Sequence, residues 1–175
     1  SHCDRNEVDK MTIESIVEEA KILANKGVKE IILVAQDTTK YGQDIYGEYS
    51  LDKLLNELVK IDSIKWIRLF YCYAHRITDS LIDVIASNDK ICKYIDIPLQ
   101  HADNEVLKNM NRVGTCEEYR NVIEKVRSKI PDLSLRTTFM VGFPGETDEQ
   151  FEHLCEFVKQ MKFDKMGCFT FSPEE

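Results

Sequence analysis

The sequence predicts an α/β fold built on a parallel sheet. From residue 12 onward, amphipathic helical stretches alternate with short runs rich in Ile, Val, Phe and Tyr, and this alternation is typical of β-α-β units. The 175 residues, 43% apolar and 31% charged, are enough for one globular domain. No repeat or low-complexity tract divides them. We therefore expect one core domain over residues 12–175 and a disordered or added tail over residues 1–11.

Three helices alternate with three strands in the first half of the domain. The helices are predicted over about 13–25, 51–61 and 79–86, and the strands at EIILVAQ (30–36), KWIRLFY (65–71) and KYIDIPLQ (93–100). Gly27 stands just past the first helix, and Ser50 is placed to cap the second. The segment DTTKYGQDIYGEY, after the first strand, predicts a loop.

The second half adds three helices and two strands. The strands are predicted at LSLRTTFMVG (133–142) and KMGCFTFSP (165–173), and the first helix over about 104–110. Each of the two longer helices begins at a capping box, formed by Thr115 with Glu118 and by Thr147 with Gln150. The last helix has an apolar stripe that we expect in the core: Phe151, Leu154, Cys155, Val158 and Met161. The pattern predicts five strands and about six helices in all.

The composition disfavours several classes of function. A formal net charge of −8 is unfavourable for general nucleic-acid binding, which depends on clustered Lys and Arg. No apolar run reaches the roughly 20 residues that cross a bilayer, and the N-terminal SHCDRNEVDKM does not resemble a secretory signal. We therefore expect a cytoplasmic protein with no membrane partner.

The six cysteines are scattered along the chain. They occupy positions 3, 72, 92, 116, 155 and 168, with no CxxC and no CxxxCxxC spacing. In a reducing cytoplasm we expect mostly buried thiols that bind no metal. Cys3, beside His2 in the polar tail, is expected to be exposed.

Three predicted strands carry a charged residue inside an otherwise apolar run: Arg68, Asp96 and Arg136. Burying an unpaired charge in a dry core costs several kcal/mol. The pattern therefore has two interpretations, and the sequence leaves both open. Either the strands enclose a polar cavity, as in an open barrel with a ligand site, or a pair such as Asp96 with Arg136 serves structure alone.

Polar side chains also follow the carboxyl ends of four predicted strands. In chain order they are Gln36 and Asp37, Tyr71 and Tyr73, Gln100 and His101, and Glu146. The carboxyl ends of parallel strands share one edge, and α/β proteins hold their ligands at that edge. The sequence therefore predicts a ligand site on this rim.

The stretch RTTFMVGFPGET (136–147) passes from a strand through a glycine-rich corner into a helix. Such corners often hold a phosphate or a nucleotide. A Walker loop requires a Gly-Lys-Ser/Thr ending, whereas Gly145 is followed by Glu146. A nucleoside triphosphate is therefore not the expected ligand.

Four segments together resemble the radical S-adenosylmethionine (SAM) domain of methylthiotransferases. They are AQDTTKYGQDIYG (35–47), YIDIPLQHADNEVLKNMNR (94–112), RTTFMVGFPGET (136–147) and FTFSPEE (169–175). The resemblance extends from about Ile13 to Glu175. AQDTT and SPEE are more similar to the RimO type, which methylthiolates an aspartate of a small-subunit ribosomal protein, than to the tRNA-modifying MiaB type.

The resemblance implies a partial (β/α) TIM-like barrel that holds SAM across its open end. In this family a CxxxCxxC loop after the first strand binds a [4Fe-4S] cluster, and reductive cleavage of SAM yields a deoxyadenosyl radical. A second cluster takes part in sulfur delivery. The implied partners are the ribosomal protein, a sulfur donor and an electron donor, and a C-terminal TRAM domain helps to bind the substrate.

The resemblance also implies which residues contact SAM. Gln36 and Asp37 are expected near its amino group, and Pro98, Gln100 and His101 near its ribose. The residues of the glycine-rich corner are expected against the adenosine portion, because a glycine has no Cβ to obstruct the ligand: Gly142, Phe143, Pro144, Gly145 and Glu146. Arg136 is the candidate for the SAM carboxylate, a charge-assisted contact, and Phe171 for one flank of the adenine. No catalytic and no metal-binding residue is assigned.

The sequence departs from the family pattern at the cluster loop. It contains no CxxxCxxC and ends before any TRAM domain. Because thiolates hold such clusters, we expect the parent enzyme to use SAM and [4Fe-4S] clusters but this chain to be inactive and to hold neither tightly. The first strand is also expected to be missing. That absence would leave EIILVAQ as an exposed edge and favour a homodimer or another cover for the edge.

Two other functions stay open beside a fragment of a RimO-type enzyme. A tRNA adenosine methylthiotransferase of the MiaB type would share the PLQH and VGFPGET segments. The absent cluster cysteines would also suit a noncatalytic module that binds a nucleotide or a protein. We prefer a truncated enzyme, since the predicted fold lacks its first strand as well as those cysteines.

Overall fold

A computed structural model of the chain describes residues 11–173. The expected tail over residues 1–11, with Cys3, therefore lies outside the described residues apart from Met11. The described part of the chain contains five strands, as predicted, and every pair within it is parallel. They are β1 (Glu30–Leu33), β2 (Trp66–Leu69), β3 (Tyr94–Asp96), β4 (Ser134–Val141) and β5 (Lys165–Thr170).

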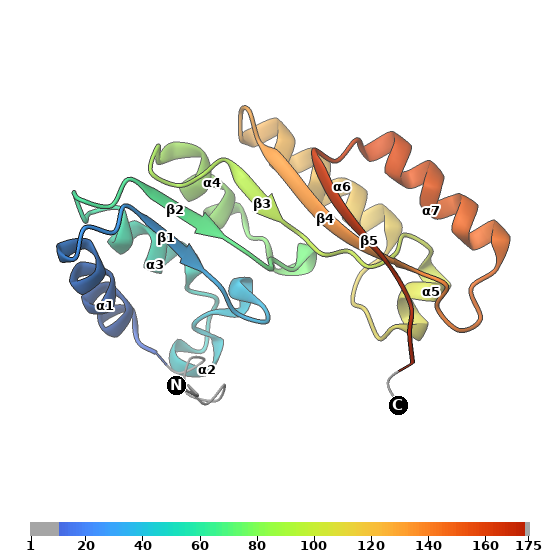
Figure 1. The fold of residues 1–175 in the computed structure, drawn as a ribbon, viewed down its shortest axis with the longest axis horizontal. Helices are drawn as coiled ribbons and strands as arrows, with labels where there is room; N and C mark the ends of the chain where they lie inside the picture. Colours follow the sequence, from blue (N-terminus) through green and yellow to red (C-terminus); the bar gives the residue numbers. More distant parts are fainter. Residues whose placement is uncertain (1–10, 174–175) are drawn as a thin grey trace.

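The strands follow one another in chain order across the molecule (Figure 1). β1 pairs with β2, and β3, β4 and β5 form a second ladder. Few backbone hydrogen bonds join the two ladders: among them, Cys92 N–H donates to Ile67 O at 2.9 Å and Cys72 N–H donates to Asp96 O at 2.8 Å. We call this weakly bonded junction between β2 and β3 the seam.

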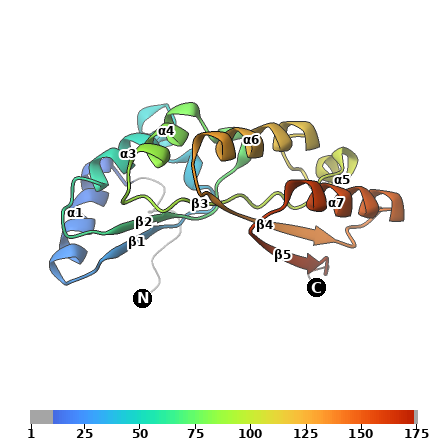
Figure 2. The same cartoon turned by 90° about the horizontal axis from the view of Figure 1, so that it is seen from above.

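Within residues 11–173, seven α-helices connect and cover the strands. They are α1 (Ile13–Asn25), α2 (Gln43–Tyr46), α3 (Leu51–Leu58), α4 (Asp79–Ser87), α5 (Asn104–Asn109), α6 (Cys116–Lys129) and α7 (Asp148–Met161). Figure 2 shows α3, α4, α6 and α7 on one side of a curved row of strands. None of the described helices covers the concave side. The arrangement is the partial barrel that the resemblance implied.

The core lies between the strands and the helices because strand side chains alternate between the two faces of a sheet. In β4, Leu135 and Phe139 are buried toward the helices, whereas Arg136 and Thr138 between them are only half-buried. Phe139 packs edge-on against Phe157 of α7. Each buried aliphatic or aromatic side chain of this kind contributes about 1.5–3 kcal/mol, so the helix-covered face holds the fold together.

Two lysines in the segment that leads into β3 bind the carboxyl ends of two helices. Lys90 Nζ donates to Val59 O at 3.0 Å and to Ile61 O at 2.8 Å, just past α3. Lys93 Nζ donates to Ile85 O and to Asn88 O at the end of α4. A cation is favourable at a helix carboxyl end, where carbonyls lack partners. These contacts tie each helix to the strand that precedes the site.

The sequence predicted where helices begin more accurately than where helices and strands end. Both predicted capping boxes are present, at Thr115 with Glu118 and at Thr147 with Gln150. Ser50 stands at the N-cap of α3, but its hydroxyl donates to Glu48 O at 3.1 Å rather than capping the helix. The helix ends at Leu58 instead of residue 61.

Several strand and loop boundaries also differ from the prediction. β1 ends at residue 33 and β3 at residue 96, because the following residues leave the ladder to form the rim. The predicted loop over 37–49 contains α2, bracketed by two left-handed glycines, Gly42 and Gly47. A four-residue helix gives no apolar periodicity to detect.

The apolar stripe predicted for α7 is wrong at one end. Phe151 is 44% exposed, whereas Phe157, outside the stripe, is 1% exposed. The thiols are also less buried than expected: Cys72 is buried, three others are half-buried and Cys168 is exposed. No helix within residues 11–173 is long and apolar enough to cross a membrane.

Candidate functional site

A hollow of about 330 Å³ lies at the carboxyl ends of the strands. Its walls come from both ladders, from the loop after β2 and from the loop between α5 and α6: Gln36, Tyr71, Tyr73, Pro98, Gln100, Arg112, Arg136, Thr138 and Phe169. We call it the carboxyl-end hollow. Four of the residues predicted from the sequence meet there, namely Gln36, Pro98, Gln100 and Arg136. The predicted convergence of strand ends on one rim is therefore present in the structure.

Arg136 in this hollow is paired with a buried carboxylate. Its Nη1 lies 3.0 Å from Asp96 Oδ1, and the Asp96 side chain is only 2% exposed while that of Arg136 is 34% exposed. The second Asp96 oxygen accepts the Tyr71 N–H at 3.3 Å. The ion pair considered from the sequence thus exists, and it lies in the wall of a cavity. Arg68, the third charged strand residue, pairs with Glu30 and lies outside this hollow.

Arg112 borders the hollow without such a partner. Among residues 11–173, no carboxylate oxygen lies within 4.0 Å of its guanidinium nitrogens. It instead donates to Pro98 O and, at 3.3 Å, to the Tyr73 hydroxyl, and its guanidinium lies 4.7 Å from the centre of the Tyr73 ring. Neutral contacts hold this cation in place and leave its charge available to an anion.

Two non-glycine residues of the hollow have left-handed backbone conformations. Tyr71 has a φ of 57° and Gln100 a φ of 73°. Such a conformation is unusual for a bulky side chain and persists only when neighbours enforce it. Thr38 N–H donates to Tyr71 O at 3.1 Å, and Gln100 N–H donates to Thr138 O at 2.8 Å. The backbone is therefore held so that both side chains border the hollow.

Asp37 lies at the rim but not in the carboxyl-end hollow. Its carboxylate pairs with Arg76 and accepts the Thr39 hydroxyl and, at 3.2 Å, the Lys40 N–H. These partners use most of its hydrogen-bonding capacity. Both Asp37 and Arg76 border a second hollow of about 500 Å³ beside β1 and α1, which Gln36 shares. Gln36 is thus better placed than Asp37 to reach a ligand in the carboxyl-end hollow.

The Glu146 side chain links the glycine-rich corner between β4 and α7 to His101. Gly142 and Gly145 have φ of 72° and 86°, and a Cβ on either would meet no protein atom within 4 Å. Gly142 N–H donates to Glu146 Oε1 at 2.6 Å, and the other oxygen of Glu146 contacts His101 Nε2. Open space therefore lies beside both glycines, but the corner borders neither hollow, so its expected contact with a ligand stays a prediction.

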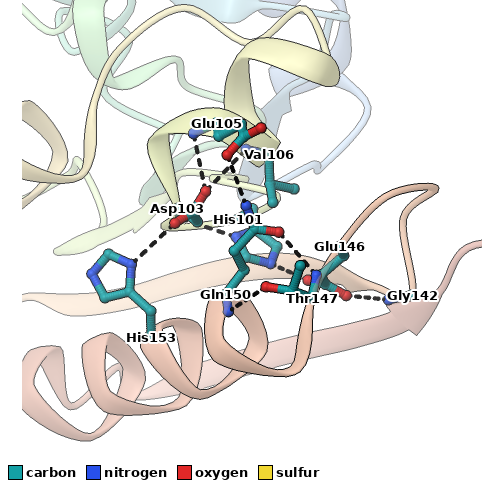
Figure 3. Close-up of polar contacts among 9 residues, drawn as sticks. All are labelled: His101, Asp103, Glu105, Val106, Gly142, Glu146, Thr147, Gln150 and His153. Atoms are coloured by element: carbon teal, nitrogen blue, oxygen red, sulfur yellow. Dashed lines mark hydrogen bonds and ion pairs between the residues drawn. The ribbon is translucent and has the colours of Figure 1, made fainter.

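His101 and Glu146 are themselves almost fully enclosed. Their side chains are 0% and 5% exposed, and neither borders either hollow. Figure 3 shows them between α5 and the start of α7, where Asp103 N–H donates to His101 Nδ1 at 3.0 Å. The resemblance predicted that both residues contact SAM. In the structure their side chains are buried next to the glycine-rich corner and border neither hollow.

The remaining predicted residues form the outer edge of the site. Phe143 and Phe171 contact each other edge-on, with ring centroids 5.3 Å apart, and Pro144 lies between the two glycines of the corner. Neither aromatic ring borders the carboxyl-end hollow. Phe169, two residues before Phe171, does so and is 60% exposed.

Several residues of the hollow were absent from the predicted SAM contacts: Tyr71, Tyr73, Arg112, Thr138 and Phe169. Period-two alternation could have found two of them, since Thr138 shares a strand face with Arg136 and Phe169 shares one with Phe171. The two tyrosines were recognised only as strand-end residues. No local signal marks Arg112, because its position depends on how α5 packs.

Two titrating groups near the site have shifted pKa values. Burial raises the pKa of the Cys72 thiol to about 12, although a hydrogen bond with Thr38 opposes the shift. Burial, and then the charge of Arg76, lower the pKa of His75 below its ordinary value of 6.5. Within residues 11–173, no three His, Cys, Asp or Glu side chains are grouped to hold a metal ion.

Residues 1–158 match the family model of the Radical SAM superfamily. The chain is 56% identical over 164 residues to the ribosomal protein uS12 methylthiotransferase RimO of Alkaliphilus oremlandii, an alignment that covers 94% of this chain and 37% of that protein. It is 57% identical over 163 residues to the protein of the same name in Caldanaerobacter subterraneus subsp. tengcongensis, covering 93% and 37%. The chain thus spans little more than a third of the length of these curated relatives.

Two solved structures share the fold at low sequence identity. Coproporphyrinogen III oxidase (HemN) from Escherichia coli, a radical SAM enzyme, superposes with a TM-score of 0.68 at 16% identity and covers 91% of this chain and 36% of that one. The cobalamin-dependent S-adenosylmethionine radical enzyme OxsB gives a TM-score of 0.64 at 11% identity, covering 85% and 22%. The resemblance identified from four sequence segments is confirmed, and this chain belongs to the radical SAM superfamily.

Proposed function

We propose that this chain is the SAM-binding part of a methylthiotransferase that acts on an aspartate of ribosomal protein uS12. The observation that carries the proposal is the 56% identity over 94% of the chain to a relative named for uS12 methylthiotransfer. The partners of the parent enzyme would be uS12, a sulfur donor and an electron donor. A ribosomal substrate also favours a cytoplasmic location.

The carboxyl-end hollow suits SAM in size and charge. Its volume of about 330 Å³ falls within the ~300–1,000 Å³ typical of small-molecule sites. Amide, hydroxyl and guanidinium groups line it beside the exposed ring of Phe169. When bound, SAM would supply a reactive sulfonium group. The residues of this chain would bind and orient it.

Arg112 is the better candidate for the SAM carboxylate. Arg136, the residue expected from the sequence, already neutralises Asp96 at 3.0 Å. Within residues 11–173, the groups around the Arg112 guanidinium are uncharged ones, among them the Tyr73 hydroxyl, the Tyr73 ring, Pro98 O and the side chain of Tyr119. A charge-assisted hydrogen bond to a carboxylate is therefore worth more at Arg112, because no internal carboxylate competes for it.

Calorimetric titration of SAM into the full-length parent enzyme tests both arginines. Arg112→Gln should weaken binding by at least about tenfold, the equivalent of one charged hydrogen bond. Arg68→Gln is the matched control, since Arg68 pairs with Glu30 at 2.8 Å and does not border the hollow. Unchanged affinity in Arg136→Ala would remove the role assigned to Arg136, and unchanged affinity in Arg112→Gln would remove that of Arg112.

The iron-sulfur cluster of the family does not fit the residues described here. Residues 11–173 contain no metal-ligating group of three, and the sequence has no CxxxCxxC. We therefore derive no step through a cluster and expect this chain alone to be inactive. Iron and sulfide content after anaerobic reconstitution, compared between this chain and a version extended upstream, tests this. Uptake of a cluster by the short chain would contradict it.

A parallel assay of the full-length enzyme with uS12 and with tRNA separates the two methylthiotransferase functions. We expect mass spectrometry to detect a methylthio group on uS12 alone. Modification of tRNA alone would favour the MiaB-type function instead. If neither substrate is modified by an enzyme that carries its cluster, a noncatalytic binding module becomes the better interpretation.

The outer edge of β1 supports a proposal about assembly. No strand within residues 11–173 pairs with that edge, and Ile32 and Val34 are 47% and 53% exposed. Unpaired strand edges favour association with another chain. We expect this chain to form a homodimer, which analytical ultracentrifugation would detect, and a strictly monomeric chain with this edge open would contradict the expectation.

A further inference from the structure

The guanidinium of Arg136 is only partly used by its neighbours. Within residues 11–173 its hydrogen bonds all come from Nη1, which donates to Asp96 Oδ1 at 3.0 Å and to Thr138 Oγ1 at 3.4 Å. A guanidinium has five N–H donors, so those on Nε and Nη2 have no hydrogen-bond partner in this part of the chain. The side chain borders the carboxyl-end hollow. Arg136 therefore holds Asp96 with one nitrogen and keeps the other two available for a ligand.

Asp96 fixes the position of that guanidinium. Its side chain is buried, and its second oxygen accepts the Tyr71 N–H from across the seam at 3.3 Å. Both carboxylate oxygens are thus engaged. The guanidinium cannot move away without leaving a buried charge unpaired, which is costly. Arg136 is therefore oriented before any ligand binds, and this lowers the cost of binding one.

Gly167 on β5 leaves a gap beside the unused Nη2 of Arg136. The register of β4 and β5 places Gly167 opposite Thr138. A Cβ on Gly167 would lie 3.6 Å from both Arg136 Nη2 and Thr138 Oγ1, and 3.5 Å from a ring carbon of Phe169. These are ordinary contact distances, so the missing side chain leaves room for a small group. We call this space, bounded by Arg136, Thr138 and Phe169, the Gly167 gap.

The polar atoms around the Gly167 gap suit a carboxylate. Nη2 of Arg136 offers N–H groups, and the Thr138 hydroxyl, which accepts a hydrogen bond from Nη1, can donate its own hydrogen. Hydrogen bonds to an ionised partner are about twice as strong as neutral ones. A cationic or apolar group in the same place would leave these donors unsatisfied. The gap therefore favours an anionic oxygen group.

The net charge of the hollow also favours an anion. Among the described residues that border it, only Arg112 and Arg136 are charged, and the buried Asp96 neutralises one of them. A net positive charge remains. SAM adds another, because its ammonium and sulfonium groups outnumber its carboxylate by one. A second ligand that enters the hollow beside SAM is therefore attracted if it is anionic.

The Gly167 gap is accessible to a large substrate from the concave side of the strands. Arg136 and Thr138 alternate along β4 with Leu135 and Phe139, which are buried toward the helices, so they face the opposite side of the sheet. None of the described helices covers that side (Figure 2). A loop of a protein substrate can therefore approach Arg136 without displacing a helix.

We infer that Arg136 and Thr138 determine the specificity for the substrate, by binding the carboxylate of its target aspartate while Arg112 binds that of SAM. The inference rests on the proposed function for the identity of both ligands. It gives Arg136 a contact with the substrate in place of the contact with SAM that the resemblance implied. Asp96 acts through Arg136 and is a positioning residue.

Substrate binding by the full-length parent enzyme with SAM bound tests the carboxylate contact. Fluorescence anisotropy would compare labelled uS12 with a form whose target aspartate is replaced by asparagine, which is uncharged and similar in shape. The wild-type enzyme should bind the aspartate form at least about tenfold more tightly, the equivalent of one charged hydrogen bond. Equal affinities for the two forms would overturn the inference but leave the proposed function intact.

A double variant tests the assignment to Arg136. Arg136→Gln alone leaves Asp96 buried and unpaired, which endangers folding, so Asp96→Asn is combined with it and two amides replace the two charges. This variant should bind both forms of uS12 alike. Arg68→Gln is the matched control and should keep the preference, because Arg68 does not border the hollow. A purely structural role of the pair would weaken both forms equally, and a ratio unchanged from the wild type would overturn the inference.

Thr138→Val tests the second donor of the Gly167 gap. It removes the hydroxyl and leaves the ion pair of Arg136 with Asp96 in place. The preference for the aspartate form should fall by about threefold or more, the equivalent of a weak neutral hydrogen bond. An unchanged preference would remove Thr138 from the inference.

SAM affinity, measured by calorimetry on the same enzymes, separates the two ligands. The double variant should bind SAM as tightly as Arg68→Gln, because the pair it replaces has no net charge and contacts the substrate instead. A tenfold loss of SAM affinity would assign Arg136 to SAM and overturn the inference. If the wild-type enzyme binds SAM but neither form of uS12, the proposed function fails and the inference fails with it. That result is distinct from equal binding of both forms, which contradicts the inference alone.

Discussion

Two loops at the carboxyl ends of the strands are each held by a paired carboxylate, in opposite ways. After β1, Asp37 pairs with Arg76, and both side chains border the hollow beside β1. After β4, Glu146 pairs with His101, and both lie behind the site with at most 5% exposure. A polar residue just past a strand can therefore border a hollow or lie buried beneath its own loop. Position along the chain does not distinguish the two roles.

Glu146 and His101 are more buried than Asp37 and Arg76. We therefore expect substitutions in the pair after β4 to lower the free energy of unfolding more than substitutions in the pair after β1. His101→Ala should lower the free energy of unfolding by about 3 kcal/mol, because it leaves a cavity and a buried carboxylate without its donor. Chemical denaturation with urea would measure this. His153→Ala on α7, whose ring is 47% exposed, is the control and should change stability little. A loss below about 1 kcal/mol in His101→Ala would remove the contrast between the loops.

For substitutions of glycine we expect the opposite: the first loop should lose more stability than the second. Gly42→Ala in the first loop should cost about 2–3 kcal/mol, because its Cβ would lie 2.5 Å from Ser50 Cβ and 2.9 Å from Glu48 O at a φ of 92°. Gly145→Ala in the second loop should cost only about 1 kcal/mol, since φ is 86° but the space is open. Thermal unfolding of the two variants would compare them, and equal losses would contradict the clash at Gly42.

Removing the carboxylate of the first loop should have a smaller effect still. Asp37→Ala should cost about 1 kcal/mol, the typical value of a lost N-cap, because Asp37 caps the turn over Thr38–Lys40 and its ion pair with Arg76 is partly solvated. Urea denaturation beside His101→Ala would test this. A loss equal to that of His101→Ala would mean that burial does not separate the two pairs.

The smallest effect concerns His75, beside the first loop. Its pKa is lowered by burial and then by the charge of Arg76, so the folded state disfavours the imidazolium. Its contribution to stability is therefore present above pH 6.5, the ordinary pKa, and is lost as the pH falls through the folded pKa. An NMR titration of the ring should give a midpoint below 6.5, and Arg76→Gln should raise it. A midpoint above 6.5 would contradict the assignment.

The sequence predicted the parts of the fold that depend on local signals. Capping boxes at Thr115 and Thr147 placed two helix starts, because both partners lie within four residues. The end of α3 and the buried face of α7 were less well predicted. Those features depend on packing: Phe157 contacts Phe139 and Phe163 across the core, and no local pattern identifies those partners.

The site, too, was predicted only where local signals place its residues. The strand ends brought Gln36, Gln100 and Arg136 to one rim, because parallel strands share an edge. The sequence did not show that Asp37 turns toward Arg76, or that His101 turns under the corner. Each of those orientations depends on a side chain 39 or 45 residues away.

The seam between β2 and β3 has a thermodynamic consequence for ligand binding. The carboxyl-end hollow takes Gln36 and Tyr71 from one side of the seam and Arg136, Thr138 and Phe169 from the other. A ligand there spans a junction that backbone hydrogen bonds support only sparsely. By mass action, its binding free energy adds to the cohesion of the two ladders. SAM would then act as a structural crosslink, and the two halves of the sheet would unfold more cooperatively in its presence than without it.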